Sequence, residues 1–278
     1  TTSATGLGGP WGPVVRLPGG NAIQDLVCPT TTRCVAATYD SSIYPVRSFL
    51  DVTQNGGRTW APRFAAPSLI SSISCATAAA CVAVDANVVI RTIDGGATWK
   101  RSKLPSSDHF NEVACPTTAH CVGVGDDHNL PVELVSVDGG VRWSVERTGL
   151  GKQADLFDVA CPSLHLCIAI GDRSEFTSSS GSPYLVASTD GGLRWRQRPF
   201  RGLVAVGSAG CTDRGLCVAT GLTSSFGSGL AISRDGGLEW AASPTPGAGV
   251  AQWAACGTHV CELVEDAPTG GSELEATW

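Results

Sequence analysis

Three observations predict an all-β fold, a six-bladed β-propeller of four-stranded antiparallel blades. The chain contains six close pairs of cysteines, and the first members of successive pairs lie 40 to 50 residues apart. Between successive pairs lies a second motif, Ser/Thr-x-Asp-Gly-Gly-x-x-Trp. Each repeat also contains four short apolar or alternating runs, A to D, separated by turn-forming residues. Four short strands in a repeated unit of about 45 residues are typical of a propeller.

The cysteine pairs predict one disulfide within each blade. The pairs are Cys28/Cys34, Cys75/Cys81, Cys115/Cys121, Cys161/Cys167, Cys211/Cys217 and Cys256/Cys261. Each pair brackets the connection from run A to run B, where two sulfurs can meet across a hairpin. Each closed loop is worth roughly 2 kcal/mol in the chain-entropy model. Zinc would favour Cys-x2-Cys clusters or converging histidines, whereas His120, His165 and His259 fall in separate repeats, so we expect no metal and no cofactor.

The glycine motif predicts the turn between runs C and D. Its five copies are Thr53–Trp60, Thr92–Trp99, Ser136–Trp143, Ser188–Trp195 and Ser233–Trp240, and the first has Asn55 in place of the aspartate. We expect the aspartate to accept hydrogen bonds from nearby backbone N–H groups and a glycine to adopt a positive φ. The tryptophan that follows is expected to cover the seam between blades.

The runs of the third repeat are predicted in order as Asn111–Cys115, Cys121–Gly125, Val132–Val137 and Val141–Glu146. We expect one domain over residues 1–278. Its blades are predicted at about 21–65, 66–105, 106–150, 151–201, 202–246 and 247–278. The last repeat stops before a D run, while Trp11–Arg16 resembles a D run that has no repeat before it. The strand within residues 10–18 is therefore expected to close the last blade and leave no free sheet edge.

Composition excludes several classes of partner. The formal net charge is −6 and 16% of the residues are charged, which argues against nucleic acid or an anionic membrane surface. No apolar stretch reaches the roughly 18 residues that a membrane span needs. Paired cysteines and the absence of methionine fit a mature segment of a secreted or extracytoplasmic protein. We expect a monomer.

The repeats resemble those of the Asp-box (BNR-repeat) propellers. That group includes sialidases, xyloglucanase-type hydrolases and photosystem assembly factors of the Ycf48 kind. The resemblance covers residues 53 to 240 and implies the propeller fold. It implies no activity, because in those families the boxes lie away from the active site and shape the scaffold. A cysteine pair in every blade departs from all three groups and indicates a secreted, cysteine-stapled branch.

Loop lengths predict which face carries the function. In an up-and-down blade the A–B and C–D connections share one end, and the B–C and D–A connections share the other. The disulfide loops and glycine turns are short and regular. Length varies in the B–C connections, which are predicted at Tyr39–Ser48, Asp126–Pro131, Asp172–Pro183 and Thr223–Gly229. Variable loops on a rigid scaffold commonly bind ligands, so we predict the functional face there.

Acidic residues recur at that end. Just after run B stand Asp40, Asp85, Asp126, Asp172 and Asp266, with Gly221 in the remaining repeat. The start of run A adds Asp25, Glu112 and Asp158. Such carboxylates can ring the mouth of a propeller channel, raise one another's pKa values and attract a cation, a cationic partner or sugar hydroxyls. The alternative is that aspartate is simply favoured in turns and at strand ends.

Aromatic and basic residues on the same face are further candidates to stack on or clamp a ligand. They are Tyr39, Tyr44, Arg47 and Tyr184, accompanied by His109, Phe110, Phe176, Phe200, Arg201 and Phe226. Taken singly, each such residue is more often part of the packing or of a solvated surface.

Two functional hypotheses follow. The first is a secreted scaffold, without enzymatic activity, that binds a glycan or protein ligand on the long-loop face. The second is a glycoside hydrolase that uses two channel-mouth carboxylates about 5 to 10 Å apart. A sialidase would need three converging arginines and a tyrosine–glutamate pair. Arg16 lies in a sequence similar to the Arg-Ile-Pro motif of that family, but it falls on the predicted closing strand and the chain has three tyrosines. We therefore favour the scaffold.

Overall fold

A computed structural model describes residues 17–20, 22–104, 109–127, 130–146, 154–173, 182–225, 227–244, 250–256, 261–266 and 272–277. The described residues form 23 β-strands in six antiparallel sheets, which we number I to VI. The chain divides into two compact units. The first unit is Val14–Arg147, and the second unit is Thr148–Trp278 together with Thr1–Pro13.

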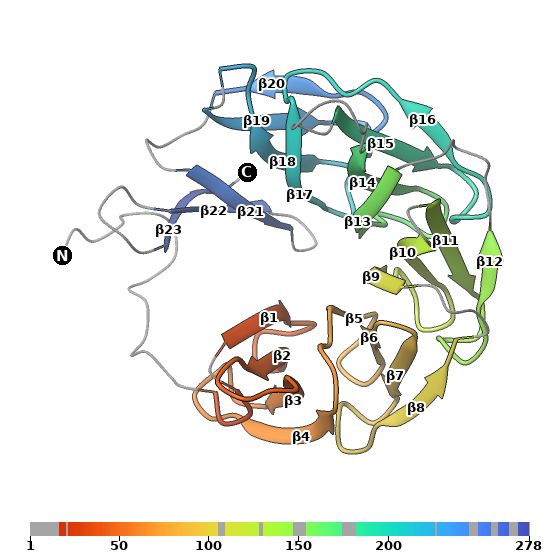
Figure 1. Ribbon diagram of the computed structural model, residues 1–278, viewed down its shortest axis with the longest axis vertical. Coiled ribbons are helices and arrows are strands. Elements are labelled where there is room, and N and C mark those ends of the chain that lie inside the picture. The colour runs from red at the N-terminus through yellow and green to blue at the C-terminus, as the bar shows by residue number, and fades with distance from the viewer. Residues whose placement is uncertain are drawn as a thin grey trace. The chain divides into compact units, whose positions relative to one another are not determined.

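The first unit contains sheets I to III. Sheet I consists of β1 (Ala22–Val27), β2 (Cys34–Asp40), β3 (Arg47–Thr53) and β4 (Ala61–Ala66). Sheet II consists of β5 (Ser72–Cys75), β6 (Cys81–Asp85), β7 (Val88–Thr92) and β8 (Lys100–Lys103). Sheet III consists of β9 (His109–Ala114), β10 (Cys121–Asp127), β11 (Leu130–Ser136) and β12 (Ser144–Glu146). In Figure 1 the first strands of these sheets gather on one side of the unit and the fourth strands on the opposite side.

The second unit contains sheets IV to VI. Sheet IV consists of β13 (Ala154–Ala160), β14 (Cys167–Arg173), β15 (Ser182–Ser188) and β16 (Arg196–Arg198). Sheet V consists of β17 (Ala205–Cys211), β18 (Cys217–Leu222), β19 (Ser228–Ser233) and β20 (Ala241–Ser243). The described strands of sheet VI are β21 (Val250–Cys256), β22 (Cys261–Asp266) and β23 (Ser272–Thr277). Residues 10–16 lie outside the described residues, so closure of the last blade and the ring of six blades remain predictions.

The predicted runs A to D correspond to the first to fourth strands of sheets I to V, and runs A to C correspond to the three described strands of sheet VI. The fourth strand of sheet III begins later than predicted, at Ser144 rather than Val141. The N–H groups of Val141 and Arg142 donate to Asp138 Oδ1 at 3.0 and 2.8 Å, which holds both residues in the preceding turn. The turn motif therefore extends as far as its tryptophan.

Alternation along the middle strands explains how neighbouring sheets pack. On β6, Cys81 and Ala83 belong to an apolar cluster with Leu50 and Val52 of sheet I. The intervening residues of β6, Val82 and Val84, belong to another cluster with side chains of sheet III. Because successive side chains of a strand point to opposite faces, sheet II is covered on both sides. This is why β6 is apolar without interruption up to its terminal aspartate.

Three of the five motif tryptophans fill the space between neighbouring sheets of the same unit, as predicted. Trp99 packs against the core between sheets I and II, and Trp143 lies in the core between sheets II and III. The ring of Trp143 meets Phe110 edge to face, with centroids 5.2 Å apart. Trp240 occupies the equivalent place between sheets IV and V and packs on Phe200.

All six predicted disulfides are present, one in each sheet, and they join the first strand to the second. Cys75 and Cys81 are direct partners in the register of sheet II. The pairs in sheets V and VI are direct register partners in the same way. The cystines therefore lie within sheets and do not link one sheet to another.

One backbone hydrogen bond joins each glycine turn to the disulfide loop beside it. The first glycine of the turn donates to the carbonyl oxygen of the residue two positions before the second cysteine. The five bonds are Gly56 to Thr32, Gly95 to Ala79, Gly139 to Ala119, Gly191 to His165 and Gly236 to Gly215, each 2.8 Å long. The A–B and C–D connections are thus hydrogen-bonded to each other at one end of the sheet, which we call the disulfide end.

A serine or threonine hydroxyl forms hydrogen bonds inside each glycine turn. In sheet III, Ser136 Oγ donates to Asp138 Oδ1 and accepts the N–H of Gly140 at 2.9 Å. Both glycines of every turn have a positive φ, whereas the sequence analysis expected one. In all five turns the N–H of the second glycine donates to the serine or threonine hydroxyl.

The opposite end of each sheet carries the B–C and D–A connections, and we call it the long-loop end. All five C–D connections have seven residues between strands, for example 93–99. The B–C connections range from two residues, 86–87, to eight, 174–181. Length variation therefore concentrates at the long-loop end, as predicted. The predicted connection Asp126–Pro131 was wrong in extent, because Asp126 pairs with Pro131 and only two residues separate β10 from β11.

We predict that Gly237→Ala destabilises the protein by at least about 2 kcal/mol in denaturant unfolding. Gly237 has a φ of 89°, and an added Cβ would lie well inside van der Waals distance of Ile168 Cγ2 on the neighbouring sheet. The matched control is Gly227→Ala, whose added Cβ would meet Thr223 Oγ1 at 3.6 Å. The control should change stability by less than about 1 kcal/mol. Equal effects of the two substitutions would contradict the packing described for this turn.

Candidate functional site

The carboxylates predicted just after run B are instead the last or next-to-last residues of the second strands, because these strands run further than predicted. They lie at the long-loop end, but in different environments. Asp85 is buried, whereas Asp40 and Asp126 are both half-buried. Asp126 stands opposite the exposed His109 in the register of sheet III. In the second unit, Asp172 is half-buried, and the side chain of Asp266 lies outside the described residues. A shared position in the repeat therefore does not give a shared role.

Asp85 is held inside the first unit. Its Oδ2 accepts a hydrogen bond of 2.6 Å from Ser68 Oγ on the connection that enters sheet II. Burial raises the pKa of Asp85, while the Ser68 hydrogen bond and the charge of Arg101 act in the opposite direction. The turn after β6 is short, and Ala86 in it has a φ of 45°. No long loop therefore follows that could carry this carboxyl group towards a ligand.

Asp40 fixes the loop that follows β2. The backbone N–H and the hydroxyl of Ser42 both donate to Asp40 Oδ1, at 2.9 and 2.5 Å. These hydrogen bonds lower the pKa of Asp40, because they stabilise the charged carboxylate. The next two residues, Ile43 and Tyr44, are exposed, and Tyr44 is 97% accessible. The exposed Arg47 lies opposite Asp40 in the register of sheet I.

In sheet IV two carboxylates face each other. Asp155 on β13 and Asp172 on β14 are direct partners in the antiparallel register. Burial raises the pKa of Asp172, and the nearby charge of Asp155 raises it further. Like charges directly opposite each other weaken a sheet, so this pair is a chemically distinctive feature of the second unit.

The carboxylates predicted at the start of run A connect neighbouring sheets. Asp25 Oδ2 accepts the N–H of Ile73 from sheet II at 2.7 Å. Asp158 Oδ2 accepts the N–H of Ala209 from sheet V at 2.8 Å, in the equivalent position of the repeat. In sheet III, Glu112 accepts a hydrogen bond from the hydroxyl of Ser72 in sheet II. The structure thus gives these three side chains a role in joining sheets, which the sequence analysis had not foreseen.

A simple signal in the sequence marks this role. Asp25, Ser72, Glu112 and Asp158 all stand three residues before the first cysteine of their repeat. Ser72 follows the same rule, since its Oγ accepts the N–H of Val113 in sheet III at 3.3 Å. Burial raises the pKa of Asp25, against the lowering effect of its backbone hydrogen bonds.

The aromatic candidates separate by exposure. Tyr184 is 1% exposed and Phe110 is 2% exposed, because both rings belong to the cores of their units, so neither is available to stack on a ligand. Tyr39 is half-buried on β2 and Phe200 packs on Trp240. Arg201 is exposed. Phe176 and Phe226 lie outside the described residues.

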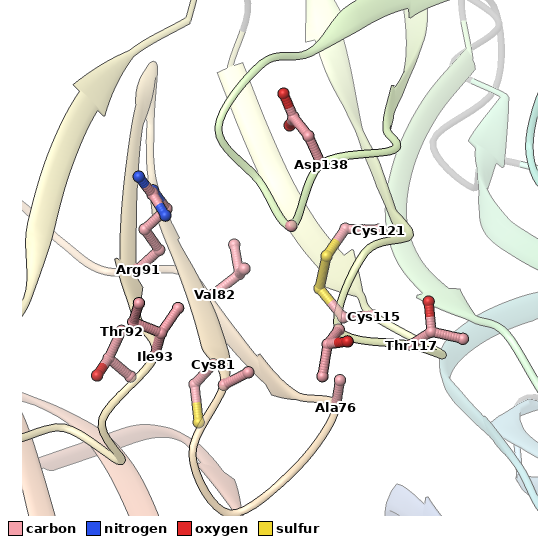
Figure 2. A pocket seen from close by; sticks show the side chains of 13 residues that line it. Ala76, Cys81, Val82, Arg91, Thr92, Ile93, Cys115, Thr117, Cys121 and Asp138 are labelled. Atoms are coloured by element: carbon pink, nitrogen blue, oxygen red, sulfur yellow. A yellow bond between two sulfur atoms is a disulfide. The ribbon is translucent and has the colours of Figure 1, made fainter.

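A pocket that the sequence analysis missed lies at the disulfide end of the first unit, between sheets II and III. Figure 2 shows Val82 and Arg91 on one wall, and Asp138 with the Cys115–Cys121 disulfide on the other. Its volume is about 80 Å³, enough for a side chain or a small anion rather than a sugar ring. The sequence feature that could have indicated this pocket is Arg91, which interrupts the apolar run of β7.

Two further findings concern metals and membranes. Within the described residues, no three His, Cys, Asp or Glu side chains gather as a metal site requires. No helix in the described part of the chain is long and apolar enough to cross a membrane.

No protein-family model and no curated protein matches the chain. Its fold is similar to that of several solved structures. A structure of YCF48 bound to D1 peptide is 17% identical, with a TM-score of 0.63, over 91% of this chain and 79% of that one. The GH74 xyloglucanase from Xanthomonas campestris is 12% identical, with a TM-score of 0.65, and the match covers 91% of this chain but 47% of the enzyme.

A third similar structure is the GH93 α-L-arabinofuranosidase of Fusarium graminearum in complex with arabinobiose. It is 12% identical, with a TM-score of 0.57, and 92% of each chain is covered. All three are β-propeller proteins, so the chain has a fold of the β-propeller class. At these identities the likeness extends to the fold alone, and the fold is shared by enzymes and by a peptide-binding protein.

Two aspartates at the same end of neighbouring sheets should respond oppositely to pH. The pKa of Asp85 is raised above 3.8, so its contribution to stability is complete below that value and is lost as the pH rises through the folded pKa. The pKa of Asp40 is lowered, so its contribution is present above 3.8 and is lost as the pH falls through the folded pKa.

Urea unfolding of Asp85→Asn and Asp40→Asn at a series of pH values tests this. Relative to the wild type, Asp85→Asn should gain stability as the pH rises, and Asp40→Asn should lose it. The same sign for both substitutions would show that the two environments have been assigned wrongly.

Proposed function

We propose that the protein is an extracytoplasmic binding scaffold that holds a protein ligand at the long-loop end of sheet I. The observation that carries this proposal is the exposed pair Ile43 and Tyr44 at the tip of the β2–β3 connection. Six disulfides in 278 residues support an oxidising compartment. The glycine turns support assignment to the Asp-box branch of the propellers.

The loop is suited to recognition because it is held in place before binding. Asp40 fixes Ser42 through two hydrogen bonds, and β2 and β3 continue in register up to the pair Asp40 and Arg47. A preorganised loop loses less conformational entropy when it binds. Tyrosine and arginine are the residue types enriched at the energetic centres of protein interfaces, and Tyr44 and Arg47 occupy this loop.

A protein ligand is favoured over a glycan by the shape of the surface. An exposed tyrosine on a projecting loop inserts into a partner's cavity, whereas a sugar is normally enclosed by a cleft of its host. The similar structure of YCF48 was solved with a bound peptide, which supports a peptide or protein ligand on this fold.

The second candidate is a glycoside hydrolase, and one observation favours it. The carboxylates of Asp155 and Asp172 face each other and the pKa of Asp172 is raised, as a general acid requires. The similar xyloglucanase and arabinofuranosidase support this candidate at the level of the fold. Hydrolysis of xyloglucan or of a fluorogenic arabinofuranoside that is abolished by Asp172→Asn would establish it in place of the scaffold.

We predict that Tyr44→Ala weakens ligand binding by at least about tenfold without changing stability. The side chain is 97% exposed, so truncation removes no internal packing. A photo-crosslinking phenylalanine derivative at position 44 would first capture the ligand from the native organism. The purified ligand would then be titrated against both proteins by biolayer interferometry.

The matched control is Val137→Ala, which truncates a side chain that is 73% exposed at the disulfide end of sheet III. It should leave the affinity within about twofold of the wild type. If Tyr44→Ala binds as tightly as Val137→Ala, the ligand does not use this loop and the proposal fails.

A further inference from the structure

The fourth strand of sheet II concentrates positive charge on an acidic protein. β8 reads Lys100-Arg101-Ser102-Lys103, and its three cationic side chains are exposed. Arg91 lies directly opposite Lys100 on β7. The whole chain has a net charge of −6, so this cluster runs against the overall balance.

The charges of this strand are largely uncompensated within the described residues. None of Arg91, Lys100, Arg101 and Lys103 forms an ion pair with a described side chain. The positive charge of Arg101 acts on the buried Asp85 and lowers the pKa of its carboxyl group. Like charges directly opposite each other destabilise a sheet, so the pair Arg91 and Lys100 has a cost that an anionic ligand would relieve.

The cations lie on both faces of the strand. Arg101 is opposite Ile90, which belongs to the core facing sheet I, so Arg101 and Lys103 lie on that side. Lys100 shares the other face with Arg91, which lines the pocket beside sheet III. An extended chain placed along β8 would meet cations on both of its faces.

The free edge of β8 offers backbone groups to such a chain. In sheet II, β8 pairs with β7 on one side and with no described strand on the other. In an antiparallel pair, alternate residues direct their N–H and C=O groups away from the partner, so part of the β8 backbone points outward. Added strands bind through these groups, and their side chains alternate between the two faces.

The pocket in Figure 2 adds an apolar border on the sheet III side. Val82 and Ile93 line it, and the side chain of Ile93 is 73% exposed. The one carboxylate among the lining residues, Asp138, is already engaged, because its Oδ1 accepts hydrogen bonds from Ser136, Val141 and Arg142. The guanidinium group of Arg91 can therefore bind an anionic group of a ligand.

Protection against aggregation is the ordinary reason for charge on an edge strand. That reason applies equally to every fourth strand, but the other fourth strands carry fewer cationic residues. β8 carries three cations, β16 carries two arginines, and β4, β12 and β20 carry at most one arginine each; β8 alone among the described fourth strands contains lysine. The concentration on β8, together with the opposed cations and the adjoining pocket, indicates a more specific use.

We propose that β8 is a docking edge for an extended acidic peptide, which adds as a strand with its carboxylates against Lys100 and Arg91 on one face and against Arg101 and Lys103 on the other. The peptide has acidic residues at consecutive positions and an apolar residue near the pocket. This surface is separate from the loop of Tyr44, and the proposal does not rest on the function proposed above.

The test uses the full chain and a fluorescein-labelled octapeptide in which four consecutive glutamates are flanked by valines. Fluorescence anisotropy should show saturable binding that weakens as salt is added, while the matched peptide with four glutamines should not bind. The K100E/R101E/K103E variant should lose at least about tenfold in affinity. Hydrogen exchange of β8 amides should slow when the acidic peptide is added.

The matched control is R194E/R196E/R201E, which makes the same change in net charge at three exposed arginines in or next to sheet IV. It should stay within about twofold of the wild-type affinity. Because the triple reversal in β8 can disturb folding, K100Q/K103Q provides a milder variant that should weaken binding in the same direction. The Tyr44→Ala variant should bind the peptide normally, so failure of this site is distinguishable from failure of the loop.

Three results would overturn the proposal. Equal loss of affinity in the two triple variants would show that net charge alone governs binding. Equal binding of the glutamine peptide would show that the cations have no part in it. Binding of a heparin oligosaccharide that depends on β8, without binding of the acidic peptide, would identify the strand as a glycan site.

Discussion

The hydrogen bond from the first glycine of each C–D turn to the carbonyl oxygen in the neighbouring disulfide loop is the constraint on which the rest of the structure depends. It recurs at the same length in five sheets, from Gly56 to Gly236. It joins two connections that are each already closed, one by a cystine and one by a serine or threonine hydroxyl. The disulfide end of each sheet is therefore fixed by short-range bonds, and freedom of sequence and length is left to the opposite end.

Packing within each unit builds on that fixed end. Tryptophans of the turns reach into the space between sheets. In sheets I, II and IV, the side chain three residues before the first cysteine accepts a backbone N–H from the next sheet. The two proposed binding surfaces are parts of the molecule that remain accessible. At the long-loop end, Tyr44 is exposed on the β2–β3 connection. At the edge of sheet II, the cationic side chains of β8 are exposed.

Much of this was predictable because the signals are local. Cysteines five or six residues apart can meet across a hairpin, and a turn motif of eight residues contains its own hydrogen-bond partners, so both were predicted from the sequence. The roles of Asp25 and Asp158 were missed because their partners, Ile73 and Ala209, lie about 50 residues away on another sheet.

The candidate site was predicted less well, for the same reason. Residue type and position in the repeat predicted Tyr184 and Tyr44 on the same functional face. Tyr184 instead lies within β15 with its ring buried, whereas Tyr44 lies in the β2–β3 connection and is exposed. The pocket at Arg91 was also missed, because two sheets build it.

The most direct measurement of the central claim is hydrogen exchange of individual amides in the native protein, followed by nuclear magnetic resonance. The account predicts strong protection of the N–H groups of Gly56, Gly95, Gly139, Gly191 and Gly236, although they lie in surface turns. The amides of Ile43 and Tyr44 at the long-loop end should exchange quickly. Exchange of the five glycines as fast as Ile43 and Tyr44 would contradict the account.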